Sequence, residues 1–126
     1  MNKLGIAPIT HDRVSIDVAD AATGVFVSVV GDIDMQDPSK LLDPFFLKLH
    51  QAALKEGTPA IEVDFRRLAF LNSSGIKALA KWAMLLAVVP TEKRYKLRFL
   101  HNKGLTWQAT SLPTLTFLVP GAITLA

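Results

Sequence analysis

The chain has 126 residues, half of them hydrophobic and a fifth charged, with a formal net charge of +3 and no cysteine. These values indicate one globular domain over residues 1–126, with its core at about 13–120, and exclude a disordered chain. The missing cysteines exclude disulfide scaffolds, cysteine nucleophiles and thiolate metal sites. No stretch has the length and apolar character of a membrane span or an export signal, so we expect a cytoplasmic protein.

Two strands come first. Val14, Ile16 and Val18 alternate with polar residues, and residues 25–30 are β-branched and almost entirely apolar. The turn-forming residues 19–24 between them predict an antiparallel hairpin, with its second strand buried.

A helix is predicted next, over residues 38–55. Its apolar residues recur at helical spacing, with Asp37 as a candidate cap and Pro38 in the first turn. Pro44 predicts a kink or a later helix start, because an internal proline removes a hydrogen bond. Residues 57–59, Gly-Thr-Pro, end the helix.

The second half alternates strands and helices in the same way. The pattern predicts a strand at 60–65, a connection at 66–71 anchored by apolar side chains, and a helix from about 75 to 88. It then predicts a strand at 96–100, a short helix at 105–111 before Pro113, and a short strand at 115–119 or 123–125. This order predicts an α/β fold: a mixed, mostly parallel β-sheet with an N-terminal hairpin, packed by helices.

The helix at 75–88 has more apolar surface than one sheet contact needs. One stripe faces inward and consists of Ile76, Leu79, Ala80, Ala83 and Ala87. A second stripe consists of Ala78, Trp82, Leu85 and Val89. The second stripe is either further core, which we favour, or an exposed contact patch.

The segment Asn72-Ser73-Ser74-Gly75 stands at the start of this helix and permits two interpretations. Ser and Asn are typical helix caps, so one serine, with Ser74 the candidate, would cap the helix and the other would be incidental. Alternatively, the loop is a phosphorylation switch, because a helix start tolerates a phosphate and Lys77 lies one turn beyond Ser73. Phosphorylation would add nearly two negative charges to a docking surface without unfolding the chain.

Three segments in this order resemble the STAS domain, and within it the bacterial anti-sigma factor antagonists. Residues 31–34, Gly-Asp-Ile-Asp, are similar to the family's Gly-Glu-Leu-Asp segment. Residues 61–71 are similar to its central strand and connector, and residues 72–76, Asn-Ser-Ser-Gly-Ile, resemble its Asp-Ser-Ser-Gly-Leu signature. The resemblance extends from about Val14 to Val119. Asn72 departs from the usual Asp, since it caps a helix but has no charge.

The resemblance implies that Ser73 is phosphorylated by a serine kinase that is also an anti-sigma factor, and dephosphorylated by a metal-dependent serine phosphatase. The unphosphorylated protein would bind the kinase and free a sigma factor. The predicted partner-binding residues are Asp32, Asp34, Asn72, Ser73, Ser74, Gly75 and Lys77, with Ser74 as the backup acceptor. We expect a monomer or weak dimer without cofactor or metal. The alternative is an unphosphorylated STAS scaffold of a signalling assembly or lipid-transport complex.

Other classes of function have weaker support in the sequence. Leu71 replaces the first glycine of a Gly-x-Ser-x-Gly nucleophile motif, and no phosphate-binding glycine motif occurs. His11 is placed in the N-terminal arm, His50 on an exposed helix position and His101 at a strand end, so they suggest neither a catalytic site nor a metal site. The basic residues 93–98 alternate with apolar ones, which predicts a strand with one solvated face rather than nucleic-acid binding.

Overall fold

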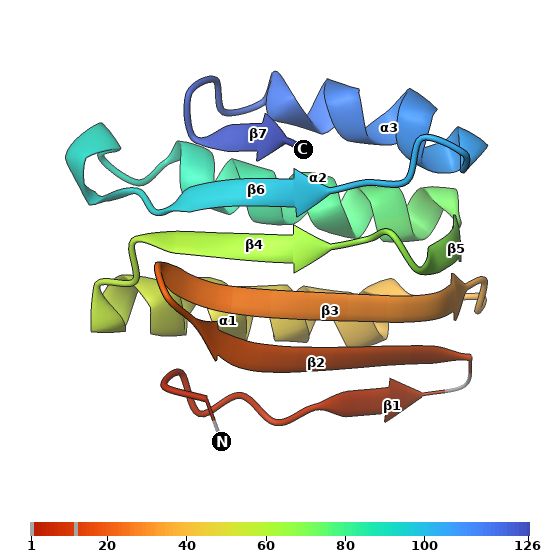
Figure 1. Cartoon of the computed structure of the whole chain (residues 1–126), viewed down its shortest axis with the longest axis horizontal. Coiled ribbons are helices and arrows are strands. Elements are labelled where there is room, and N and C mark those ends of the chain that lie inside the picture. Colours follow the sequence, from red (N-terminus) through yellow and green to blue (C-terminus); the bar gives the residue numbers. More distant parts are fainter. Residues whose placement is uncertain (1, 12) are drawn as a thin grey trace.

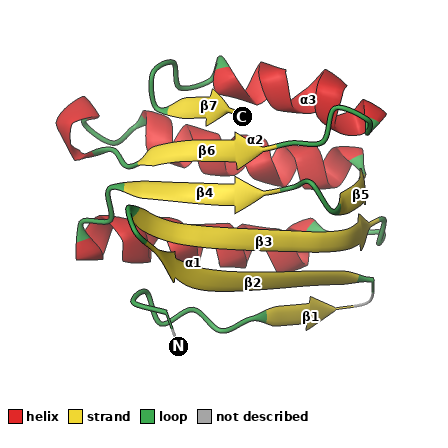
Figure 2. Ribbon diagram, in the orientation of Figure 1, coloured by secondary structure: helices red, strands yellow, loops and turns green. Residues whose placement is uncertain are grey.

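Strands and helices alternate along the chain in the computed structural model, which describes residues 2–11 and 13–126 (Figure 2). The elements are β1 (Ile9–His11), β2 (Val14–Ala21), β3 (Gly24–Ile33), α1 (Ser39–Glu56), β4 (Ala60–Asp64), β5 (Leu68–Leu71), α2 (Ser73–Ala87), the 3₁₀ turn η1 (Thr91–Lys93), β6 (Lys96–Leu100), α3 (Thr106–Thr116) and β7 (Ile123–Leu125). No helix in this part of the chain is long and apolar enough to cross a bilayer.

The strands form one mixed sheet with the order β1-β2-β3-β4-β6-β7, and β5 extends it beside the end of β3 (Figure 1). β2 is antiparallel to β1 and to β3. The β3–β4, β3–β5, β4–β6 and β6–β7 pairs are parallel. The predicted α/β class, with a mostly parallel sheet and an N-terminal hairpin, is confirmed.

Helices α1 and α2 lie side by side on one face of the sheet, and Figure 1 looks onto the opposite face. Side chains alternate between the faces, so Val14, Ile16 and Val18 are buried while Ser15 and Asp17 are exposed. The same alternation buries Leu97 and Phe99 of β6 and exposes its cations. Buried side chains extend from Leu4 and Ile6 to Ile123.

Aromatic and polar side chains join α1 to α2. Phe46 stacks on Trp82 with ring centroids 4.7 Å apart. The Tyr95 hydroxyl accepts a hydrogen bond from Trp82 Nε1 and lies 2.7 Å from His50 Nδ1. His50 is buried, so its predicted exposed position is wrong, and burial lowers the pKa of its ring. In the second stripe of α2, Ala78 and Trp82 are buried core, as the favoured interpretation predicts, whereas Leu85 and Val89 are half-buried.

Two prolines lie inside helices, and the structure departs there from the prediction, although α1 itself lies within one residue of its predicted range 38–55. α1 begins at Ser39 without delay although Pro44 lies inside it, and Asp37 supplies no side-chain cap. α3 continues through Pro113 to Thr116, because Leu112 and Leu115 are buried and hold the last turns against the core. A proline near a helix start or end removes only one hydrogen bond, which packing compensates.

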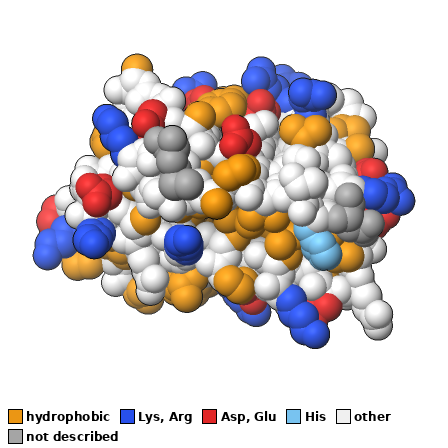
Figure 3. Space-filling view, turned by 90° about the horizontal axis from the view of Figure 1, so that it is seen from below, with side chains coloured by type: hydrophobic (Ala, Val, Ile, Leu, Met, Phe, Trp, Pro, Cys, Tyr) orange, Lys and Arg blue, Asp and Glu red, His pale blue; other side chains and the backbone are white. Residues whose placement is uncertain are grey.

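Two short strands were not predicted. β5 lies in the segment expected to be a connection, and it pairs with β3. Its Leu68 and Leu71 are buried anchors, but Phe70 is 46% exposed. β1 forms one edge of the sheet, and Figure 3, seen from that side, shows hydrophobic patches across the middle with charges around them. Because β1 has only three residues, this edge offers little length for pairing with another strand.

Candidate functional site: the turn into helix α2

The start of α2 lies beside the end of β3. Parallel pairing sets Asp32 opposite Phe70 and Ile33 opposite Leu71. The chain then turns, and the Asn72 amide donates to the Ile33 carbonyl at 3.1 Å. The structure therefore brings the predicted segments 31–34 and 72–75 together at one edge of the sheet, although they are about forty residues apart in the sequence.

Asn72 is the N-cap of α2, and Ser74 is not the cap that we predicted. The Asn72 side-chain oxygen accepts from the Gly75 amide at 2.9 Å. Its Nδ2 donates to the Met35 carbonyl at 2.9 Å. An ionised Asp would cap the helix equally well but has no hydrogen to donate to Met35. The departure from the family's Asp thus has a local physical reason, a tie between the helix start and the segment after β3.

Ser73 and Ser74 occupy the first two helical positions, and both are exposed. Neither hydroxyl has a hydrogen-bond partner within residues 2–11 and 13–126. Amide groups in the first turn of a helix have no partner within the helix and carry the positive end of its dipole. Lys77 is exposed and stands on the same helix face as Ser73, one turn along. The turn thus presents an accessible hydroxyl in a locally positive setting.

Gly75 is buried, and its role is steric. A Cβ at this position would lie 2.3 Å from Leu71 Cδ1 and 3.1 Å from Leu71 Cγ. Leu71 is itself only 3% exposed, so it has little room to move. The glycine therefore lets α2 begin tight against β5, and it would influence a partner through the shape of the turn.

The two aspartates at the end of β3, Asp32 within the strand and Asp34 just after it, share one arginine. Arg13 reaches Asp32 Oδ2 at 2.9 Å and Asp34 Oδ2 at 3.2 Å. The Asp32 amide donates to the Arg13 carbonyl at 3.0 Å. Gly31 has a φ of 113°, and a Cβ there would lie 1.9 Å from the same carbonyl. Residues 31–34 are therefore held in place by a close backbone approach and an exposed ion-pair cluster.

Arg13 and Phe70 belong to this surface but were missed in the sequence. A two-residue hairpin turn at Ala22-Thr23 pairs Val14 with Gly31, and extending that register places Arg13 beside Asp32. The hairpin register was thus an available signal for Arg13. Phe70 is apolar, and the sequence predicts it to be an anchor. Its exposure follows from the irregular β5, in which Leu68 and Leu71 are both buried and the register shifts beside Gly31 and Asp32, so simple strand alternation does not place Phe70 outside.

The histidines lie away from the turn. His11 is in β1, His50 contacts Tyr95 in the core, and His101 Nδ1 donates to the main-chain oxygen of Ala126 at 2.6 Å. None is hydrogen-bonded to Ser73 or Ser74. In the part of the chain that the structure describes, no group of three or more His, Cys, Asp or Glu side chains is placed to hold a metal ion.

No protein-family model and no curated protein matches the chain, whereas solved structures do. The crystal structure of an anti-sigma factor antagonist from Mycobacterium paratuberculosis is similar, with a TM-score of 0.61 and 23% identity over 91% of this chain and 88% of that chain. The chain has a STAS-like fold. A second match, SiaC in the complex of the Pseudomonas aeruginosa diguanylate cyclase SiaD with its activator SiaC, has a TM-score of 0.68 and 22% identity over 96% of this chain and 100% of that chain.

Within this STAS-like fold, the three segments that carried the resemblance are neighbours in space. Residues 31–34 end β3, residues 61–71 contain β4 and β5, and residues 72–76 open α2. The β3–β4 and β3–β5 pairings join them. The residues that carry the similarity are scattered along the sequence, but in the folded chain they form one continuous region.

Proposed function

We propose that this chain is a non-catalytic regulatory binding protein of the anti-sigma factor antagonist type. It would bind a serine kinase that acts as an anti-sigma factor, and phosphorylation of Ser73 by that kinase would release it. A serine phosphatase would restore binding. The observation that carries the proposal is the exposed Ser73 hydroxyl at the first position of α2, without a partner in the described residues.

Electrostatics explain why the fold would survive while the complex would not. A phosphate at Ser73 would face the amide groups of the first turn and the Lys77 ammonium, both of which favour negative charge. The same phosphate adds nearly two negative charges and bulk to an exposed surface, where a docked partner must exclude water. Asp32 and Asp34 would contribute to that surface together with Arg13.

A second candidate is a binding protein of the same surface that is never phosphorylated. The similarity to SiaC, an activator in complex with a diguanylate cyclase, favours it, because such a protein regulates an enzyme by binding. Asn72 also favours it, since the turn lacks the negative charge next to the serine that the family's signature carries.

Intact-mass measurement of the protein from its own cells, before and after phosphatase treatment, separates the two candidates. The switch predicts a phosphatase-sensitive form that disappears in Ser73→Ala. Absence of phosphate in every growth condition would favour the constitutive binder.

Binding measurements test the switch directly. We expect Ser73→Asp to reduce affinity capture of the partner from a cell lysate at least about tenfold, while Ser73→Ala binds like the parent. Both variants should unfold within about 0.5 kcal/mol of the parent, because the site is exposed. Thr106→Asp, at the exposed first position of α3 and outside the predicted partner-binding residues, is the matched control for charge. If Ser73→Asp captured as much partner as the parent, phosphorylation control would be excluded.

A further inference from the structure

An open groove runs between α1 and α2, beginning one turn beyond the candidate phosphorylation site. It has a volume of about 690 Å³. Phe46, Ala78 and Trp82 form its buried floor, and Leu47, Met84 and Val88 line it while exposed. Val88 is 80% exposed and Met84 is 53% exposed. Large exposed apolar side chains gathered around a groove are typical of a protein-binding surface.

The charges of the groove are confined to one end. Lys77 and Lys81 line the part near the start of α2, and the far end is lined by Met84, Leu85 and Val88. Asp43 is the one acidic side chain in the lining, and its Oδ2 pairs with Lys81 at 2.9 Å. Lys77 has no ion pair with any described residue. The net charge of the lining is therefore positive, which favours an occupant with carboxylates at that end.

The length of the groove suits a helix. The lining residues of α2 extend from Lys77 to Val88 and recur at spacings of three and four, so they span about 16 Å along the helix axis. An amphipathic helix lying along such a groove presents apolar anchors at the same periodicity, over about three turns. We propose that this groove binds an amphipathic partner helix with apolar anchors over Met84 and Val88 and acidic side chains over Lys77 and Lys81.

Because this helix would also cover the start of α2, the inference rests on the proposed partner-binding role of that turn. It also adds a reason for release on phosphorylation. A phosphate on Ser73 would compete with the partner's carboxylates for Lys77, one turn away on the same helix face.

Two fluorescein-labelled model peptides test the inference. One is an amphipathic helix of Leu, Ala and Glu with Leu at helical spacing, and the other has every Glu replaced by Lys. Fluorescence anisotropy with the full chain should show at least about tenfold tighter binding of the Glu peptide. Amide chemical-shift changes should fall on residues 77–88 and on Leu47.

Variants with matched controls locate the site. Met84→Glu should weaken Glu-peptide binding at least about tenfold, whereas Phe117→Glu, which alters the exposed apolar side chain at the C-cap of α3, should not. Lys77→Glu should weaken it, whereas Lys103→Glu should not. Asp43→Asn should strengthen it, because that change leaves Lys81 without its acidic partner.

Any of three peptide results would overturn the inference: no binding of the Glu peptide, equal binding of both peptides, or shift changes confined to the uncovered sheet face. Concentration-dependent dimerisation that Met84→Glu abolishes would also overturn it, since the occupant would then be a second copy. The peptide assay uses unphosphorylated protein, so these results leave the Ser73 switch standing. Conversely, absence of phosphate on Ser73 leaves the groove proposal intact.

Discussion

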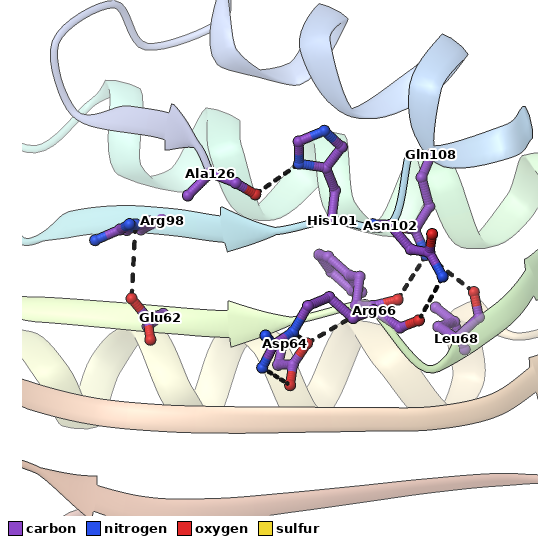
Figure 4. A network of polar contacts seen from close by, with 10 residues as sticks. Glu62, Asp64, Arg66, Leu68, Arg98, His101, Asn102, Gln108 and Ala126 are labelled. Carbon is purple, nitrogen blue, oxygen red and sulfur yellow. Dashed lines mark hydrogen bonds and ion pairs between the residues drawn. The ribbon is translucent and has the colours of Figure 1, made fainter. Parts of the chain in front are cut away.

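Two polar regions lie at the same edge of the sheet, where parallel strands end, and they differ in how fully their groups are paired. After β4 and β6, a network of hydrogen bonds ties α3 to the sheet (Figure 4). Buried Gln108 donates from Nε2 to the Phe65 and Leu68 carbonyls at 2.5 and 3.1 Å and accepts from the Asn102 amide at 2.7 Å. After β3 and β5, two exposed serine hydroxyls and Lys77 have no such partners in the described chain.

The extent of hydrogen bonding distinguishes a polar cluster that serves folding from one that is available for binding. Buried polar groups must be hydrogen-bonded, so a saturated cluster such as that around Gln108 is explained by folding alone. Among the described residues of the turn into α2, only the Asn72 side chain, which shapes the backbone, has hydrogen-bond partners. The remaining polar groups of the turn contribute little to folding, which leaves them available for a partner.

We expect the largest loss of stability from the substitution Gln108→Leu. The change removes three hydrogen bonds: the Asn102 amide loses its side-chain acceptor, and the Phe65 and Leu68 carbonyls each lose one donor and keep another, the Leu68 amide and Trp107 Nε1. At roughly 1 kcal/mol for each bond, the free energy of unfolding should fall by about 2–3 kcal/mol. Urea denaturation measures it, with exposed Gln51→Leu on α1 as a control expected within about 0.5 kcal/mol of the parent. Partner capture per folded molecule should stay unchanged. Loss of capture in the folded variant would mean that the hydrogen-bond network around Gln108 also serves binding.

Asn72→Asp, in the turn into α2, should have an intermediate effect on stability. The carboxylate keeps the cap to the Gly75 amide and loses the donation to Met35, at a cost of about 1 kcal/mol. Asn72→Ala loses both bonds and should cost about 2 kcal/mol. Thermal unfolding of the three proteins gives the order. Equal stability of Asn72→Asp and the parent would show that the Met35 contact does not explain the asparagine.

We expect the smallest change in stability from acid, which acts on the contact between Asp64 and Arg66 beside the network around Gln108. The side-chain hydrogen bonds from Arg66 lower the pKa of Asp64, whose oxygens lie 2.9 and 3.0 Å from the guanidinium. Because the folded pKa is lower than the unfolded one, the ionised carboxylate stabilises the fold above about pH 4. This contribution is lost as the pH falls through the folded pKa. Unfolding measured from pH 7 to 2 should show a shallower acid loss in Asp64→Asn than in the parent, with exposed Asp17→Asn as the control.

Most of the fold could be predicted because its main elements have strong periodic patterns. The β2–β3 hairpin, β6 and the two long helices bury one face each, so their apolar spacing is visible in the sequence. β1 and β5 have three and four residues and exist through pairing with β2 and β3, which no local pattern shows. The exposed side chain of Phe70 follows from the same limitation. His50 differs, because it lies at helical spacing from buried Phe46 and Ala53, and its polar character led to the wrong expectation of exposure.

For the candidate site, local patterns in the sequence were enough to predict the order of strands and helices, the serines at a helix start and the lysine one turn beyond. These are local properties, set by spacing along a single element. Three further features become visible only in the folded chain: Asn72 rather than Ser74 caps α2, Arg13 contacts both Asp32 and Asp34, and α1 and α2 leave a groove between them. Each of these depends on contacts between segments far apart in the chain, and such contacts are set by packing.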